Sequence, residues 1–183
     1  MDRMFAPWRL AFLKGEEQDR DPIPSPSGCI FCDYALAPGV APPDGTTRRA
    51  WDRRRLVVTV REHALVILNK YPYGNGHVMV VPRAHGDQLE ALPVDAFTAL
   101  HELLRETIAA LREAYRPHGM NVGMNMGEAA GAGIAAHVRY HALPRWRGDV
   151  NFLPVFGDTK VISEALDDTW ARLAERLRRS DEG

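Results

Sequence analysis

The sequence is poor in the features that secreted and membrane proteins rely on. Only two of its 183 residues are cysteine, so a network of structural disulfides is excluded. No apolar run approaches the roughly 18 residues of a membrane-spanning helix, and the N-terminal stretch "MDRMFAPWRL" has no apolar signal-peptide core. We therefore predict a cytoplasmic protein with no membrane partner.

An excess of charge of one sign is also missing. The chain has 23 basic and 24 acidic residues and a formal net charge of −1, which gives no electrostatic footprint for duplex nucleic acid. Local basic clusters occur in "RRAWDRRR" (48–55) and "RLAERLRR" (172–179), and we interpret both as solvated surface. We predict no nucleic-acid partner.

What is present is the composition of a globular domain. Hydrophobic residues make up 45% and charged residues 26% of a chain long enough to bury one core, so we predict a single domain over 1–183. The segments 15–28 and 37–47 are polar and rich in proline, serine or glycine, and they are predicted to be loops.

Hydrophobic periodicity predicts an α+β fold. Strands are expected at 56–69 (one or two), 77–82, 120–127 and 137–146, a long amphipathic helix from about 93 to 115, and a C-terminal helix from about 163 to 179. Strands, then one long helix, then more strands indicate an antiparallel sheet with the helices packed on a face.

The two cysteines are spaced as Cys29-x-x-Cys32, a pattern that favours a metal or redox site in a reducing compartment. A closed zinc site needs two further ligands, which must be histidine or carboxylate. Of the seven histidines, His85 and His137 are the best placed, at one edge of the predicted sheet. The alternative is a pair of reduced thiols in a surface loop. Thioredoxin-type chemistry is disfavoured because no helix pattern starts at the cysteines.

The predicted strand "HVRYHALPRW" places His137, Arg139 and His141 on one face, because side chains alternate along a strand. The preceding "GEAAGAGIAAH" is neither a P-loop nor a dinucleotide fingerprint. Its backbone N–H groups could form an anion-binding concavity, although a tight connection between two strands explains it as well. A guanidinium flanked by imidazoles and exposed amides suits a phosphate or polyphosphate ligand.

These segments resemble the histidine-triad (HIT) family, whose signature alternates three histidines with apolar residues. The resemblance extends through "APWRL", "GCIFC", "LNKYPYGNGHVMVVPRAH", "PHGMNVGMNMG" and "PRWRGDVNFLPVFGDTKVI", and it is strongest to the bacterial diadenosine tetraphosphate phosphorylase-like branch. It implies a HIT-like α+β fold, a homodimer, and binding of adenine nucleotides or dinucleoside polyphosphates. Active members split the α-phosphate linkage through a covalent nucleotidyl-histidine.

The resemblance also assigns residues. It implies a structural zinc ion held by Cys29, Cys32, His85 and His137. It implies that His141 faces the phosphate and that His77 supports the active-site histidine. The remaining nucleotide contacts that it implies are Asn69 at the ribose, Asn125 near the phosphate, and Gly131 and Gly133 in the glycine-rich loop, where relatives often carry a serine in place of Gly133. Trp146, Asp149 and Asn151 belong to a segment typical of this branch and receive no role.

The sequence departs from the family at the middle position of the motif, where the nucleophilic histidine is replaced by Arg139. A guanidinium has no lone pair to attack phosphorus. Arg139 could instead stabilise charge on the phosphate while water or phosphate attacks, with His141 or His77 moving protons. Alternatively, the protein binds a nucleotide without turnover, the arginine is an introduced or strain-specific substitution, or Arg139 pairs with a carboxylate such as Glu128.

Overall fold

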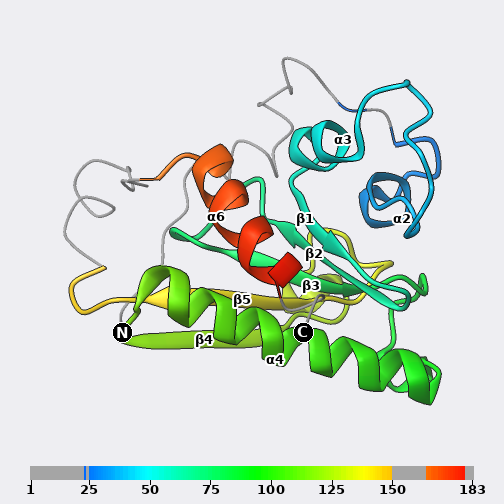
Figure 1. Ribbon diagram of the computed structural model, residues 1–183. Coiled ribbons are helices and arrows are strands. Elements are labelled where there is room, and N and C mark those ends of the chain that lie inside the picture. Colours follow the sequence, from blue (N-terminus) through cyan, green and yellow to red (C-terminus); the bar gives the residue numbers. More distant parts are fainter. Residues whose placement is uncertain (1–22, 24, 150–163, 180–183) are drawn as a thin grey trace, which may run out of the picture.

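The structure is a computed structural model that describes residues 23, 25–149 and 164–179. Its centre is a five-stranded antiparallel sheet in the order β1-β2-β3-β5-β4 (Figure 1). The strands are β1 (Val57–Val60), β2 (Ala64–Leu68), β3 (Val78–Pro82), β4 (Gly119–Met124) and β5 (Tyr140–Arg145). The predicted antiparallel sheet is therefore confirmed, and the segment 56–69 forms two strands.

Two long helices accompany the sheet, as predicted. They are α4 (Val94–Tyr115) and α6 (Leu166–Arg179), and each begins within three residues of its expected start. Two short 3₁₀ helices lie at Leu89–Ala91 and Glu128–Ala130. Loop 37–47 contains only turns and irregular backbone, as expected, whereas most of the predicted loop 15–28 lies outside the described residues.

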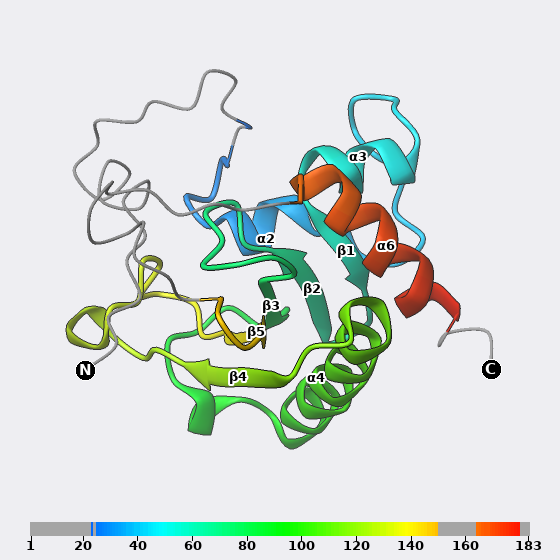
Figure 2. The same cartoon turned by 90° about the vertical axis from the view of Figure 1, so that its left-hand side faces the viewer.

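The sheet is buried on both faces by different elements. Helices α4 and α6 pack on one face, where Leu100, Leu111, Trp170 and Leu173 meet apolar side chains of the strands. Helix α2 (Ile30–Tyr34) covers part of the opposite face and adds Phe31 to a second cluster with Leu65 and Val81 (Figure 2). All residues of β2 and β3 are buried, which explains why these strands are continuous apolar runs rather than alternating ones.

Among the described residues, two α-helices were not predicted. Helix α2 begins directly after Cys29, contrary to the expectation that no helix starts at the cysteines. Helix α3 (Arg48–Arg54) and its C-cap residue Arg55 make up the basic cluster 48–55, and its interpretation as solvated surface is wrong for two residues. Trp51 and Arg55 are buried, and the Arg55 guanidinium lies over the Trp51 ring at 3.1 Å from its centroid. Helix α2 has five residues and helix α3 has seven, and both are too short to show a clear helical period in the sequence.

The strand β5 is shorter than predicted. It begins at Tyr140, so His137 and Arg139 lie in the non-strand segment that leads into it, and only His141 of the three is a strand residue. Within the described residues, no helix is both long and apolar enough to cross a membrane.

Candidate functional site

Four predicted metal ligands converge where helix α2 meets the end of β3. The ligand atoms of Cys29, Cys32, His85 and His137 all lie within 4.8 Å of one another. The Nδ1 atom of His137 is 3.3 Å from the Cys29 Sγ, and the Nδ1 of His85 is 3.3 Å from the Cys32 Sγ. A tetrahedral zinc site with ordinary bond lengths has nitrogen–sulfur edges of roughly 3.6 Å. The donor set and its spacing therefore fit a zinc ion.

The protonation of His137 is fixed by its surroundings. Its Nε2 lies 2.8 Å from the Pro82 carbonyl oxygen, which can only accept a hydrogen bond. Nε2 therefore carries the proton, and the Nδ1 lone pair faces the thiols, as in metal sites whose outer partners set the histidine tautomer. Burial lowers the pKa of His137, and neighbouring His85 and Arg139 add to the shift against the opposing Pro82 hydrogen bond.

The Cys32 thiol is protonated at neutral pH in the absence of a metal. Loss of surrounding water raises the pKa of the Cys32 thiol to about 11, and the neighbouring Cys29 and Asp33 contribute to the shift. A bound cation would displace this proton, so metal binding at the cluster is expected to release protons.

Side chains of helix α3 donate hydrogen bonds to backbone carbonyl groups at and just beyond the end of α2. The Trp51 indole N–H donates to the Tyr34 carbonyl oxygen at 2.9 Å. The Arg48 guanidinium donates to the carbonyl oxygens of Leu36 and Ala37 and also pairs with Asp52. These bonds satisfy carbonyl groups at and beyond the end of α2 that have no helical partner.

A second group of predicted residues meets at the same sheet, where His77 directly precedes β3 and His141 lies in β5. The His77 Nε2 is 3.0 Å from the His141 Nδ1. The His77 Nδ1 accepts the backbone N–H of Tyr73 at 3.0 Å, so the neutral His77 ring carries its proton on Nε2 and donates it to His141. The neutral His141 ring must then carry its own proton on Nε2. His141 is thus prepared to donate a hydrogen bond, not to attack.

The two histidines line a hollow of about 280 Å³. Asn125 and Leu143 also line it, together with Tyr73, Asn121, Val122, Gly123 and Met124. Gly123 pairs with His141 across β4 and β5, and a Cβ at Gly123 would meet nothing within 4 Å, so its missing side chain leaves the hollow open beside the imidazole. The Tyr73 ring stacks on His77 with centroids 4.9 Å apart. Tyr73 was missed because its main contribution is a backbone N–H, which any residue could supply.

Arg139 does not line this hollow. It is only 5% exposed, and its Nη1 donates to the carbonyl oxygens of Ile134 at 2.7 Å and of His137 at 3.0 Å. Its guanidinium carbon lies 5.5 Å from the centroid of the Phe31 ring. The side chain therefore points back toward the metal cluster and the glycine-rich loop.

The other predicted contacts are distributed around the hollow. The Asn69 Oδ1 accepts the Tyr71 N–H, which turns its amide nitrogen toward His77 Nδ1 at 3.3 Å, and Asn69 itself does not line the hollow. A Cβ at Gly131 would lie 3.8 Å from the Asn125 amide nitrogen. Gly131 has a φ of +84°, a left-handed conformation that favours glycine. The roles of Asn69, Gly131 and Gly133 toward a nucleotide stay predictions.

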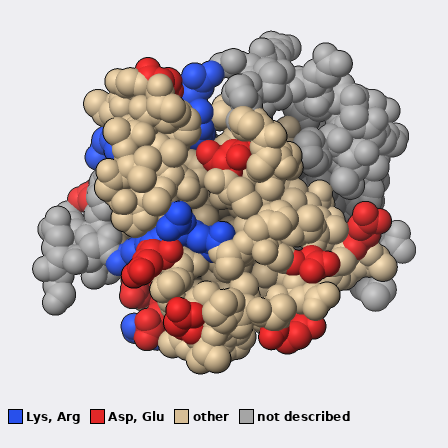
Figure 3. Space-filling view, turned by 90° about the vertical axis from the view of Figure 1, so that its right-hand side faces the viewer, with Lys and Arg blue, Asp and Glu red and all other residues tan. Residues whose placement is uncertain are grey.

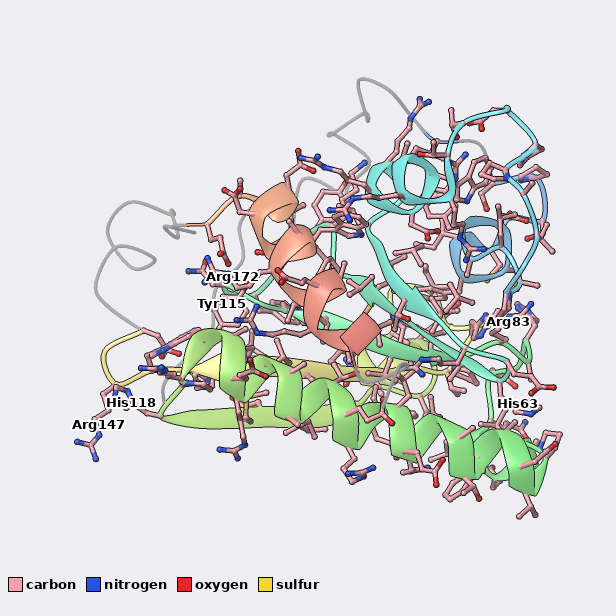
Figure 4. The ribbon with its side chains drawn as sticks, in the orientation of Figure 1. His63, Arg83, Tyr115, His118, Arg147 and Arg172 are labelled. Carbon is pink, nitrogen blue, oxygen red and sulfur yellow. The ribbon has the colours of Figure 1, made fainter. Side chains whose placement is uncertain are left out.

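The segment after β5 has a structural explanation. The Asp149 carboxylate accepts from the Arg145 Nε at 2.6 Å and Nη2 at 2.9 Å, and from the Trp146 N–H. The Trp146 ring meets Tyr115 edge-on. Asn151 lies outside the described residues. Of the remaining histidines, His118 accepts the Arg147 N–H at one end of the molecule and His63 lies near Arg83 at the other (Figure 4). His101 of helix α4 contacts the Tyr140 hydroxyl at 3.1 Å.

A larger hollow of about 920 Å³ lies between helices α3 and α6 and the end of α4. Two of its charged groups are paired with each other: Arg172 lies 2.7 Å from Glu164, and it also lies over the Tyr115 ring (Figure 4). It contains no histidine or cysteine. We therefore place the candidate chemistry at the smaller hollow.

The fold and the paired histidines define a class of protein. Residues 53–148 match the HIT domain family. The chain is 35% identical over 179 residues to the AP-4-A phosphorylase of Mycobacterium tuberculosis, a match that covers 98% of this chain and 86% of the relative. The chain therefore belongs to the HIT domain family.

Solved structures agree on the fold. A zinc-bound histidine triad family protein from Mycobacterium smegmatis superposes with a TM-score of 0.56 at 24% identity, covering 69% of this chain and 86% of that one. A hypothetical histidine triad nucleotide-binding protein from Sulfolobus tokodaii gives 0.54 at 27% identity, covering 69% and 83%.

Proposed function

We propose that this protein binds an adenine nucleotide or dinucleoside polyphosphate in the hollow beside His141. The observation that carries the proposal is the His77–His141 pair, whose tautomers direct an N–H of His141 to a ligand. The Asn125 amide lines the same hollow and supplies a further donor for phosphate oxygens. The relative named for AP-4-A supports a dinucleoside polyphosphate as the substrate class.

The proposed activity resembles that of a dinucleoside polyphosphate phosphorylase or hydrolase acting at the α-phosphate. His141 donates its Nε2 proton to a phosphate oxygen, and His77 holds it in that tautomer. Because Arg139 cannot form a nucleotidyl intermediate, water or phosphate must attack the α-phosphorus directly. The bond from this phosphorus to the bridging oxygen then breaks, and that oxygen of the leaving group takes the His141 proton.

The second candidate function is nucleotide binding without turnover. It is favoured by the direction of Arg139, whose guanidinium is hydrogen-bonded to two carbonyl oxygens and lies over Phe31 rather than in the hollow. In that arrangement the arginine removes the nucleophile without offering its charge to the phosphate.

The test compares the parent with Arg139→His and Arg139→Gln. Diadenosine tetraphosphate is incubated with each protein, with and without phosphate, and the products are separated by chromatography. We expect Arg139→His to be faster than the parent by on the order of a hundredfold or more, because an imidazole at this position can attack. Arg139→Gln removes the arginine without adding a nucleophile and should show no such gain.

Each alternative result has a meaning. Equal rates for the parent and Arg139→His contradict the assignment of position 139 as the nucleophile position. A parent rate comparable to that of an active phosphorylase supports direct attack. Failure to bind AMP at millimolar concentration contradicts the nucleotide proposal itself.

We further propose that Cys29, Cys32, His85 and His137 hold a structural zinc ion, which would fix helix α2 against the sheet. The converging ligand atoms and the His137 tautomer support this assignment. We propose a homodimer and no nucleic-acid partner. On the face shown in Figure 3, basic and acidic side chains are interspersed and form no continuous basic surface, which agrees with the near-zero net charge.

A further inference from the structure

Arg139 connects two parts of the protein that have separate proposed roles. One hydrogen bond of its Nη1 goes to the carbonyl oxygen of His137, a proposed metal ligand, and the other goes to the carbonyl oxygen of Ile134 in the glycine-rich loop. The guanidinium is almost fully removed from solvent, so these bonds form in a poorly screened environment.

The metal side of this connection is tightly packed. Phe31, under the guanidinium, stands between the two cysteine ligands in the sequence and is buried. Its ring also meets the His137 ring edge-on, with centroids 5.3 Å apart. A metal bound by Cys29, Cys32 and His137 would therefore immobilise the His137 carbonyl and the Phe31 ring, which both contact the guanidinium.

The other side leads to the nucleotide hollow. The loop from Gly127 to Ala136 is closed on itself by hydrogen bonds from the Gly131 and Ala132 N–H groups to Glu128 and Gly127. Its Gly131 approaches Asn125, which lines the hollow with His141. Ile134 packs against the same apolar cluster as Phe31. The Ile134 carbonyl is thus a point at which Arg139 sets the position of the loop.

We infer that Arg139 is a positioning residue that couples occupancy of the metal cluster to nucleotide binding. A bound metal would order His137 and Phe31, these would order the guanidinium, and the guanidinium would order the glycine-rich loop beside Asn125. Two ligands that order the same group share the cost of ordering it, so each binds more tightly when the other is present. The inference rests on the proposed zinc and nucleotide sites.

The experiment measures the coupling directly. The dissociation constant of AMP is determined by calorimetry for zinc-loaded and zinc-stripped protein, and the ratio of the two values is compared between the parent and Arg139→Met. We expect a ratio of about fivefold or more in the parent. It should fall close to one in Arg139→Met, because methionine fills the buried space without donating to either carbonyl.

Two further variants keep the test decisive. Phe31→Leu removes the aromatic surface under the guanidinium and should give an intermediate ratio, which is informative even if Arg139→Met fails to fold. Arg105→Met removes an exposed cation from helix α4 and should keep the parent ratio. As a second readout, AMP should slow the release of zinc to a chelator in the parent but not in Arg139→Met.

The failures are distinguishable. If the parent binds no zinc, the proposed metal site is wrong, and if it binds no AMP, the proposed nucleotide binding is wrong. If it binds both and its ratio is one, or if Arg139→Met and Phe31→Leu keep the parent ratio, the sites are as proposed and the coupling through Arg139 is wrong.

Discussion

The buried imidazole of His137 makes the metal-free protein sensitive to acid. Burial lowers its pKa in the folded state, so between that value and about 6.5 the unfolded chain binds more protons than the folded one. The free energy of unfolding therefore rises with pH through this window and is lost as the pH falls below about 6.5. Urea denaturation in excess chelator at pH 7.5 and pH 5.5 measures the loss.

The control for this prediction is His137→Asn, which keeps a polar side chain but does not titrate. Its stability should change less between the two pH values than that of the parent. If both proteins lose the same free energy on acidification, other groups cause the effect and the prediction is wrong.

Gly76 illustrates how a residue without chemistry can position one that has it. It precedes His77, has a φ of +71°, and a Cβ there would lie 3.0 Å from Tyr115 and 3.1 Å from Pro144. We expect Gly76→Ala to cost roughly 1–3 kcal/mol of unfolding free energy and to weaken AMP binding. Urea denaturation and calorimetry measure the two effects.

Gly148→Ala is the matched control for that variant. Gly148 has a similar φ of +78°, but a Cβ there would meet nothing within 4 Å. It should show the strain of a left-handed alanine without the steric clash. If the two variants lose equal stability and Gly76→Ala binds AMP normally, the close approach of Tyr115 to Gly76 is not needed to position His77.

At the scale of single residues, the sequence predicted which residues form the site better than it predicted where their side chains point. Spacing pointed to Cys29 and Cys32, because two thiols in one turn already define half of a tetrahedral site. The strand pattern placed Arg139 beside His141 on one face, yet its long side chain turns back to carbonyl oxygens of the preceding loop. Loop carbonyls carry no signal in the sequence, so this direction could not be predicted.

At the scale of elements, helix α2 depends on the cluster at its start. It has five residues, and no side chain caps its N-terminus. So short a helix is unstable alone and must be held by tertiary contacts. A zinc ion would supply such contacts at the start of α2. Helix α3 supplies them at the end of α2, through Trp51 and Arg48.

We therefore expect Cys29→Ser to lose stoichiometric zinc, measured by metal analysis after gel filtration, and to lower the melting temperature to that of chelator-treated parent. Tyr34→Phe is the control in the same helix: it removes the hydroxyl bond to the Ile23 carbonyl but no metal ligand. It should keep its zinc. Retained zinc in Cys29→Ser would contradict the assigned ligand set.

The elements predicted correctly share one property, a hydrophobic period sustained over enough residues. Helix α4 repeats its apolar positions over 22 residues, and its burial follows that repeat. Helices α2 and α3 have too few turns to show a period. The start of β5 was missed because β pairing begins only at Tyr140, where β3 and β4 both become available as partners.

At the scale of the whole molecule, the sheet has an edge that invites a partner. Among the described residues, β4 pairs only with β5, and its other side is an open row of backbone groups. Most of the strand is exposed or half-buried, including Val122 at 42%. An exposed apolar edge strand is a template for pairing with a second chain, and β4 carries no charged residue to prevent it.

If the proposed homodimer forms through β4, a charge at the middle of this strand should break it. We expect the parent to sediment as a dimer and Val122→Lys as a monomer, because each copy would bring an ammonium group to the same apolar seam. Val40→Lys is the matched control: Val40 is 49% exposed but lies in a loop away from the edge, so this variant should stay dimeric.

A monomeric parent contradicts the homodimer, whereas a dimeric Val122→Lys protein shows that the dimer interface does not lie at β4. Because Val122 itself lines the nucleotide hollow, Val122→Lys should also weaken AMP binding, whereas Val40→Lys should not.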